Sequence, residues 1–231
     1  MHKLGLIGGT GPESTIVYYR EIEYGVQQRL GRNFFPNLTI ESLSVFDVLR
    51  FCENGDYEGL TEYLLRGIHS LAGAGAEYAA LTGITPHVVF DQLSQRSPIP
   101  LVSMVDAARD YAREQGYERI CLLGTLPTMN GTFFQKSFAE RGIEVVTPTD
   151  EEKEYIGEKI ETELELGRVV PDTQRRFQQI AERMIREEQV QAVVLGCTEL
   201  PLAFEGIKLP VPYIDVMRVH IDALIDLILA E

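Results

Sequence analysis

The chain alternates between short apolar runs and longer segments in which apolar residues recur every three or four positions. The short runs are bounded by glycine, proline or small polar residues and predict buried β-strands, whereas the longer segments predict amphipathic helices. The predicted strands cover residues 3–8, 37–44, 77–81, 100–103, 119–124, 143–146, 191–196 and 211–214. The predicted helices cover residues 16–30, 57–72, 105–114, 128–141, 151–166, 171–188 and 216–230. Strands that alternate with helices at this spacing predict an α/β fold of parallel sheets with helices on both faces.

The predicted elements also form a faint internal repeat. A Gly-Gly-Thr turn at residues 8–10 precedes a helix with two adjacent tyrosines, and a Gly-Thr turn at 124–125 precedes a helix with two adjacent phenylalanines. Residues 77–83 align with residues 191–197 without a gap. The chain therefore divides into two similar halves, and small polar residues follow corresponding strands in each half.

Gly83 corresponds to Cys197 in this alignment. The repeat predicts two pseudo-symmetric α/β domains, the first formed by residues 1–99 with 212–231 and the second by residues 100–211. Ligands of open parallel sheets bind at the carboxyl ends of the strands. We therefore expect the active site in the cleft between the two domains.

Composition and charge narrow the possible partners. With 231 residues, of which 45% are hydrophobic, the chain can bury a sizeable core. The formal net charge of −14 repels nucleic acid and anionic membranes, so we expect neither as a partner. No stretch approaches the roughly 18 apolar residues of a membrane span, and the first residues lack the apolar run of a signal peptide. We expect a soluble, cytoplasmic protein, and we interpret the acidic residues concentrated at 150–165 as a solvated helix face.

Cysteine and histidine are too scattered to indicate a structural metal or disulfides. The three cysteines, Cys52, Cys121 and Cys197, lie far apart without paired spacing, and the four histidines are equally dispersed. We therefore expect no metal site and no disulfide framework.

A thiol, a hydroxyl and a carboxylate follow the predicted strand at 191–196 in three consecutive positions, as Cys197, Thr198 and Glu199. A buried strand that stops at a glycine and delivers such groups is typical of a functional site. On its own, a cysteine after a β-branched run is more often an inert core residue than a nucleophile. The functional interpretation of Cys197 therefore depends on the other strand ends.

The first predicted strand ends in a glycine turn at residues 8–12 that opens a helix. This turn lacks both the full dinucleotide-binding pattern and the lysine of a phosphate loop. We interpret it as a place where backbone amides near Gly9 and the Thr10 hydroxyl approach a ligand carboxylate at a helix N-terminus. A simple tight turn is the alternative.

Two further strand ends carry hydroxyl groups. Thr85 can donate to a carboxylate oxygen, and His87 beside it is more typical of a capping or core histidine than of a catalytic base. Thr125 and Thr128 offer two hydroxyls at another helix N-terminus. Ordinary N-capping by Thr128 would also explain that pattern.

These stretches together resemble the aspartate/glutamate racemase family. They read Gly-Gly-Thr-Gly-Pro-Glu-Ser-Thr at residues 8–15, Thr-Pro-His at 85–87, Leu-Gly-Thr at 123–125 with Thr-Met at 128–129, and Leu-Gly-Cys-Thr-Glu-Leu-Pro-Leu at 195–202. They follow the family's order over nearly the whole chain. The resemblance implies a cofactor-independent amino-acid racemase, a homodimer of two-domain subunits, with the substrate held in the cleft.

The chain departs from the family at one of the two thiols that flank the substrate α-carbon. Cys197 matches one of these thiols, which transfer protons on opposite faces. The other belongs to a Cys-Asn-Thr motif, where this chain has Gly83, Ile84 and Thr85. The partner thiol and the asparagine amide are therefore absent. Thr82 is the neighbouring hydroxyl, although an unassisted alkanol is a poor proton relay at neutral pH.

Our leading hypothesis is a racemase of a small acidic amino acid, aspartate or glutamate. Cys197 is its candidate acid and base, and Thr82 is a second candidate catalytic group. The expected substrate-binding residues are Gly9, Thr10, Arg50, Thr85, Thr125, Thr128, Thr198 and Glu199. Glu199 would tune Cys197 or cap the following helix. Arg50 would bind the side-chain carboxylate, or it is a surface residue.

Two other hypotheses stay open. Replacement of the first thiol by glycine resembles the arylmalonate decarboxylases, in which a single cysteine protonates the enediolate left by loss of carbon dioxide. A single-cysteine decarboxylase of a substituted malonate is therefore the second hypothesis. A non-catalytic carboxylate-binding homologue is the third. Each predicts a small-molecule carboxylate ligand, and we expect no cofactor.

Overall fold

The computed structural model describes residues 1–230, which separate into two compact units. Unit 1 contains Met1–Met104 and the C-terminal residues from His220 onward, and unit 2 is Val105–Val219. The chain leaves unit 1 at the start of helix α5 (Met104–Glu114) and returns to it within helix α11 (Val216–Leu229). The boundaries predicted from the internal repeat, after residues 99 and 211, precede these two crossings.

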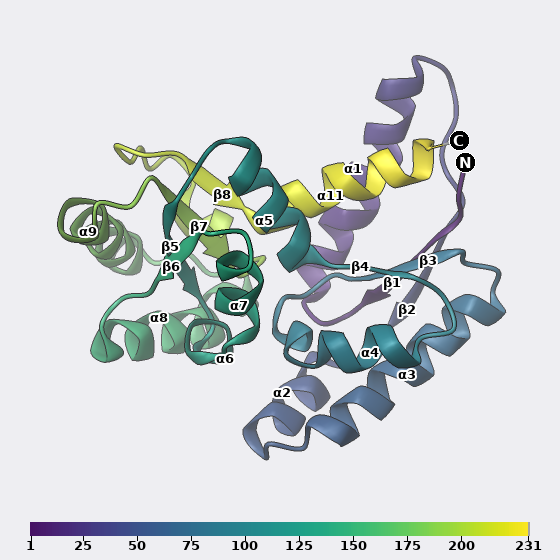
Figure 1. The fold of residues 1–231 in the computed structure, drawn as a ribbon, viewed down its shortest axis with the longest axis horizontal. Helices are drawn as coiled ribbons and strands as arrows, with labels where there is room; N and C mark the ends of the chain where they lie inside the picture. Colours follow the sequence, from purple (N-terminus) through teal and green to yellow (C-terminus); the bar gives the residue numbers. More distant parts are fainter. Residues whose placement is uncertain (231) are drawn as a thin grey trace. The chain divides into compact units, whose positions relative to one another are not determined.

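Unit 1 is built on a four-stranded parallel sheet with the strand order β2-β1-β3-β4 (Figure 1). Its strands are β1 (Leu4–Gly8), β2 (Leu38–Ser42), β3 (Tyr78–Leu81) and β4 (Leu101–Val102). Its helices are α1 (Pro12–Leu30), α2 (Val45–Glu53), α3 (Tyr57–Gly73), the 3₁₀ helix η1 (Thr85–Val89) and α4 (Phe90–Arg96), together with the last turns of α11.

Unit 2 repeats this plan, with a four-stranded parallel sheet in the order β6-β5-β7-β8. Its strands are β5 (Arg119–Gly124), β6 (Glu144–Val146), β7 (Ala192–Gly196) and β8 (Tyr213–Asp215). Its helices are α5, α6 (Leu126–Asn130), α7 (Phe133–Ala139), α8 (Asp150–Thr162), the 3₁₀ helix η2 (Leu164–Leu166), α9 (Pro171–Glu188) and α10 (Leu200–Phe204).

The central strands are buried along their whole length. All five residues of β1 and all five of β7 are buried, as expected when helices cover both faces of a parallel sheet. An apolar run without alternation is the sequence pattern that such a strand requires, because neither face meets water. The predicted fold class, two α/β units with parallel sheets flanked by helices, is confirmed.

Helices α1 and α11 pack closely in unit 1 and bring the chain ends together (Figure 1). A Cβ atom at Gly25 would lie only 2.4 Å from Cδ1 of Ile225, so glycine permits the close approach of the two helices. The Tyr18 hydroxyl lies 2.8 Å from Nδ1 of the fully buried His220. The inner face of α1 is therefore fixed to the core of unit 1.

Two predicted helices end earlier than expected. The segment 128–141 forms two short helices, because Gly131 adopts an extended conformation (φ −70°, ψ 161°) and its amide donates to the carbonyl of Pro127. The segment 151–166 is helical only to Thr162 and then tightens into η2. Sequence periodicity did not indicate either break, since apolar residues continue at helical spacing across both.

Helix α2 was not predicted. Its N-terminus is stabilised by the Ser44 hydroxyl, which accepts a hydrogen bond from the amide of Asp47 at 3.4 Å. The helix has only nine residues, of which Val48 alone is fully buried.

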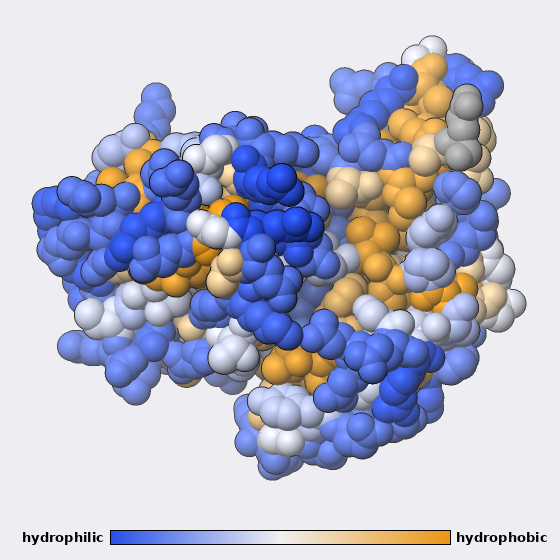
Figure 2. Space-filling model, viewed as in Figure 1, coloured by the Kyte–Doolittle hydropathy of each residue, from blue (hydrophilic) through white to orange (hydrophobic). Residues whose placement is uncertain are grey.

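Hydrophilic residues cover most of the face of the molecule shown in Figure 2. Apolar residues reach the surface mainly over the part of unit 1 that carries α1 and α11. Within residues 1–230, no helix combines the length and the apolar character needed to cross a membrane.

Candidate active site

The two central strands of unit 2 end side by side. Gly124 of β5 pairs with Gly196 of β7 in the parallel register, so the residues after both strands emerge at one edge of the sheet. A Cβ atom at Gly124 would lie 2.9 Å from the Gly196 carbonyl oxygen, and one at Gly196 would lie 2.5 Å from Cδ1 of Leu122. Both glycines are therefore needed for the close packing that brings Thr125 and Cys197 to the same edge.

Cys197, Thr198 and Glu199 form one hydrogen-bonded cluster after β7. The Cys197 thiol donates to Oε2 of Glu199 at 3.1 Å, and the Thr198 hydroxyl donates to the same oxygen at 2.8 Å. All three residues are buried. The Glu199 side chain makes no capping hydrogen bond to helix α10, so its contacts fit an interaction with the thiol rather than a cap.

Burial and nearby negative charge determine the protonation state of the thiol. The pKa of Cys197 is raised well above its usual value, first by desolvation and then by the charges of Glu199 and Glu165. The group is therefore a thiol at neutral pH and acts as a proton donor in this state. To act as a base, it must first transfer its proton to an acceptor, and the Glu199 carboxylate is within hydrogen-bonding distance.

Glu165 is a third acidic group near this cluster, and the sequence analysis missed it. It lies on η2, which packs against α10. Desolvation and the charges of Glu199 and Glu161 raise the pKa of Glu165 to about 7. The sequence interpretation of residues 150–165 as a solvated face is wrong at this position, since Leu164 beside Glu165 is buried.

Thr125 and Thr128 lie together at the end of β5. Their Oγ1 atoms are 3.0 Å apart, and Thr128 is fully buried. Thr125 is the N-cap residue of α6, without a capping hydrogen bond from its side chain. Thr128 thus lies inside the helix, and the alternative that it is the N-cap is wrong.

The glycine turn after β1 lies against the end of β3 in unit 1. A Cβ atom at Gly83 would lie 2.8 Å from the carbonyl oxygen of Thr10 and 2.9 Å from Thr10 Oγ1. The Thr10 hydroxyl is buried and has no hydrogen-bond partner within residues 1–230. The hydroxyl therefore lies beside residue 83, and it is available to hydrogen bond a ligand.

Thr82 is committed to the sheet instead. It is fully buried, and its hydroxyl donates to the carbonyl of Ile7 at 3.1 Å. The Thr15 hydroxyl, which accepts from the amide of Gly9 at 2.9 Å, lies 3.2 Å from Thr82 Oγ1. This network holds the glycine turn in place. The contacts of Thr82 therefore favour a positioning role for this residue.

Thr85 and His87 begin η1, directly after Gly83. His87 Nε2 accepts from the amide of Met104 at 3.1 Å, so Nδ1 carries the proton and lies 3.1 Å from the carbonyl of Gly83. His87 is buried and stacks on Phe90. Its contacts are those of a core histidine that fixes the Gly83 backbone.

Arg50 lies on α2 and not at a strand end. Its guanidinium is largely exposed and pairs with Asp47 on the same helix at 2.6 Å. This arrangement favours the alternative that Arg50 is a surface residue. Within residues 1–230, no group of three or more His, Cys, Asp or Glu side chains is placed to hold a metal ion.

The fold and these strand ends define a class: a two-unit parallel α/β protein with polar strand-end sites and a buried thiol in one of them. The family described as Asp/Glu/hydantoin racemase matches residues 7–224. The chain belongs to this family.

Individual relatives agree with the family assignment. The broad specificity amino-acid racemase RacX of Bacillus subtilis is 22% identical over 219 residues, which cover 92% of each chain. The structure of a Yersinia pestis protein proposed to be an Asp/Glu racemase is 32% identical, with a TM-score of 0.91 over 100% of both chains. An aspartate racemase homologue from Pyrococcus horikoshii is 35% identical, with a TM-score of 0.83 over 99% of both chains. These relatives support an amino-acid racemase as the general activity.

Proposed function

We propose that this protein racemises a small acidic amino acid, aspartate or glutamate, by proton transfer at Cα through Cys197. One observation carries the proposal: the buried Cys197 thiol donates to the Glu199 carboxylate at 3.1 Å, at the end of a central strand. The thiol has a proton acceptor within reach, so it can exist both as the acid and, after transfer of its proton, as the base.

The proposed chemistry moves one proton at a time. Glu199 takes the Cys197 proton, and the thiolate then removes the Cα proton of the substrate. The electron pair left on Cα spreads into the substrate carboxylate as an enediolate. Return of a proton to the opposite face gives the other enantiomer, and return to the same face gives exchange without inversion. Glu165, with a pKa of about 7, can exchange protons with this cluster at neutral pH.

In a cofactor-independent reaction, which the family resemblance implies, hydrogen-bond donors must stabilise the enediolate. We assign this role to the hydroxyls of Thr10, Thr85, Thr125 and Thr128. The Gly9 amide and the Thr198 hydroxyl already donate to Thr15 and Glu199, so we assign Gly9 to the shape of the turn and Thr198 to the position of the Glu199 carboxylate. The unpartnered Thr10 hydroxyl beside Gly83 is also the best candidate to hold a water or a proton where the family has its second thiol. We further propose that the enzyme is a homodimer, as the family resemblance implies.

Deuterium exchange tests the proposal directly. Purified protein is incubated in deuterium oxide with each enantiomer of aspartate and of glutamate. Mass spectrometry then measures deuterium at Cα, and chiral chromatography measures the other enantiomer. We expect Cα deuteration for at least one acidic amino acid, with slower inversion. The racemase proposal is wrong if neither signal appears. Thermal stabilisation by these amino acids without turnover would instead support the non-catalytic carboxylate-binding homologue.

A decarboxylase of a substituted malonate is the second candidate, and the close contact at Gly83 favours it. The backbone of Thr10 lies where a side chain at position 83 would begin, which leaves Cys197 as the single thiol, as in a reaction that needs only one protonation. In its ground state the thiol is protonated, which suits that role. Release of carbon dioxide from an arylmalonate, lost in Cys197→Ala, would establish this activity.

Glu165→Gln should remove a pH dependence centred near 7. In the wild type, the ionised Glu165 can take on the proton that Glu199 has accepted from Cys197, so the exchange rate should fall about tenfold per pH unit below its pKa. The variant should show a slower rate and no such step. Initial rates of Cα deuteration between about pH 5 and about pH 9 measure the difference.

Protein stability gives an independent readout of the same carboxyl group. The folded state raises the pKa of Glu165 and so favours its neutral form. Its contribution to stability is therefore present at low pH and lost as the pH rises through about 7. Glu165→Gln should unfold at a higher temperature than the wild type above this pH. Glu154→Gln, an exposed change on α8, is the matched control, and an equal gain in that variant would contradict the assignment.

A further inference from the structure

The outer face of α1 exposes a row of large apolar side chains. Ile16, Tyr19 and Tyr24 of this helix are 58%, 50% and 58% exposed, and Phe35 from the following segment is 51% exposed. The Tyr24 and Phe35 rings pack edge to face with centroids 5.6 Å apart. Exposed aromatic residues gathered in this way mark interaction surfaces more often than solvated ones.

A buried carboxylate lies in the middle of this face. Glu23 is 9% exposed, and its Oε2 has no hydrogen-bond partner within residues 1–230. It lines a hollow of about 310 Å³ together with Tyr19, Arg20, Tyr24 and Phe35. A buried carboxylate oxygen without a donor is costly, so the hollow is complementary to a cationic donor.

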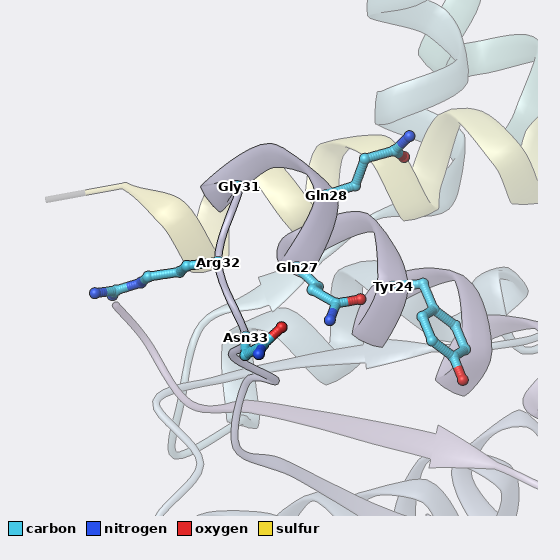
Figure 3. Close-up of a pocket in the computed structure, with 6 residues that line it drawn as sticks. All are labelled: Tyr24, Gln27, Gln28, Gly31, Arg32 and Asn33. Carbon is cyan, nitrogen blue, oxygen red and sulfur yellow. The ribbon is translucent and has the colours of Figure 1, made fainter.

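Polar groups extend the same face toward the end of the helix. A second hollow of about 510 Å³ begins at Tyr24 and is lined by Gln27, Gln28, Gly31, Arg32 and Asn33. Figure 3 shows these residues along the last turns of α1 and the segment that follows. An aromatic centre with a rim of amide and guanidinium groups is the usual composition of a protein–protein interface.

The charges on this face are self-complementary. Arg20 lies three residues before Glu23, and its guanidinium pairs with the half-buried neighbour Glu21 at 3.1 Å. If a second α1 packed antiparallel about a two-fold axis between residues 21 and 22, Arg20 of each copy would lie opposite Glu23 of the other. The same axis sets Tyr19 opposite Tyr24. In a two-fold interface each such contact occurs twice.

We propose that this outer face of α1 is the surface through which two copies of the chain pair, with Arg20 of one copy bound to Glu23 of the other. The proposal deepens the homodimer stated under the proposed function. Helix α1 has 19 residues and is about 28 Å long, which is sufficient for an interface of ordinary size. The partner is therefore a second copy of this chain.

A charge-swap experiment tests the pairing. Sedimentation velocity measures the dimer dissociation constant of the wild type, Arg20→Glu, Glu23→Arg and the double variant. Each single variant places two like-charge pairs in the interface and should raise the dissociation constant at least about 100-fold. The double variant restores both ion pairs with reversed polarity and should recover most of the affinity. Arg186→Glu, an exposed reversal on α9 in unit 2, is the matched control and should leave the dimer intact.

Three results would overturn the proposal. They are a monomeric wild type, a dimer that Arg20→Glu leaves unchanged, and loss of the dimer without recovery in a folded double variant. If the protein is monomeric and tetramethylammonium chloride stabilises the wild type but not Glu23→Gln, the hollow is a small-cation site instead. Deuterium exchange at Cα is measured on the same samples. Sedimentation then reports on the dimer alone, and Cα deuteration reports on the proposed racemase chemistry.

Discussion

Cys197→Ala should lose Cα proton exchange by about 10³-fold or more, since it removes the proposed acid and base of the reaction. The side chain is small and its neighbours are rigid strand-end residues, so the fold should be kept. Cys197→Ser should be almost as inactive, because a hydroxyl with the same environment is a much weaker acid than a thiol. Deuterium incorporation into aspartate and glutamate measures both variants.

Cys52→Ala is the matched control for this prediction. Cys52 is a partly buried thiol on α2, and burial together with Glu53 raises its pKa. It lies on a helix and not in the segment that follows a central strand, so its removal should leave the exchange rate unchanged. If the two variants Cys52→Ala and Cys197→Ala lose Cα exchange to a similar extent, the loss reflects lower protein stability and not the removal of a catalytic group. Full activity in a folded Cys197→Ala variant would rule out Cys197 as the acid and base of the reaction.

Gly83→Cys should increase inversion relative to Gly83→Ala by about 10²-fold, because it adds the thiol that the family uses on the other face. The comparison with alanine is essential. Both variants add a Cβ atom that would lie 2.8 Å from the carbonyl oxygen of Thr10, so both should lose about 1–3 kcal/mol of stability. The ratio of their inversion rates isolates the thiol from this steric cost.

Thermal unfolding and chiral chromatography check the two parts of this prediction. A folded Gly83→Cys variant with no more inversion than Gly83→Ala would mean that the two halves are wrongly aligned at residue 83. If the alanine variant keeps wild-type stability, the contact with Thr10 is looser than the structure indicates. The first result would make the single-thiol decarboxylase the leading hypothesis, whereas the second would remove the contact that favours it.

Local sequence patterns were sufficient to predict an element when the residues of that element alone determine its structure. The apolar run at 119–124 is a strand with those bounds because it is buried on both faces and stops at a glycine. The break at Gly131 was missed, because glycine is compatible with a helix and only its extended backbone in the fold shows otherwise. Helix α2 was missed because it buries little apolar surface.

The candidate site was predicted from the sequence only in part. The Gly-Cys-Thr-Glu stretch after β7 could be identified directly, since the three functional groups are consecutive. The acid Glu165 could not, because its proximity to Cys197 depends on how η2 packs against α10. Arg50 shows the opposite error, since its type suggested carboxylate binding but its helix leaves it exposed beside Asp47.

The sequence alone thus determined the α/β architecture and the thiol, because periodicity and strand-end residues are local properties of the chain. Only the tertiary structure decided which groups work with that thiol and what fills the place of the missing one. The Thr10 backbone approaches Gly83 only when β1 and β3 are paired in the sheet. Likewise, Glu23 becomes an unpartnered buried carboxylate only when the aromatic residues of α1 and Phe35 fold around it. The first feature arises from a contact between strands that are distant in sequence, and the second from the return of the segment around Phe35 against α1, so helix and strand periodicity encode neither.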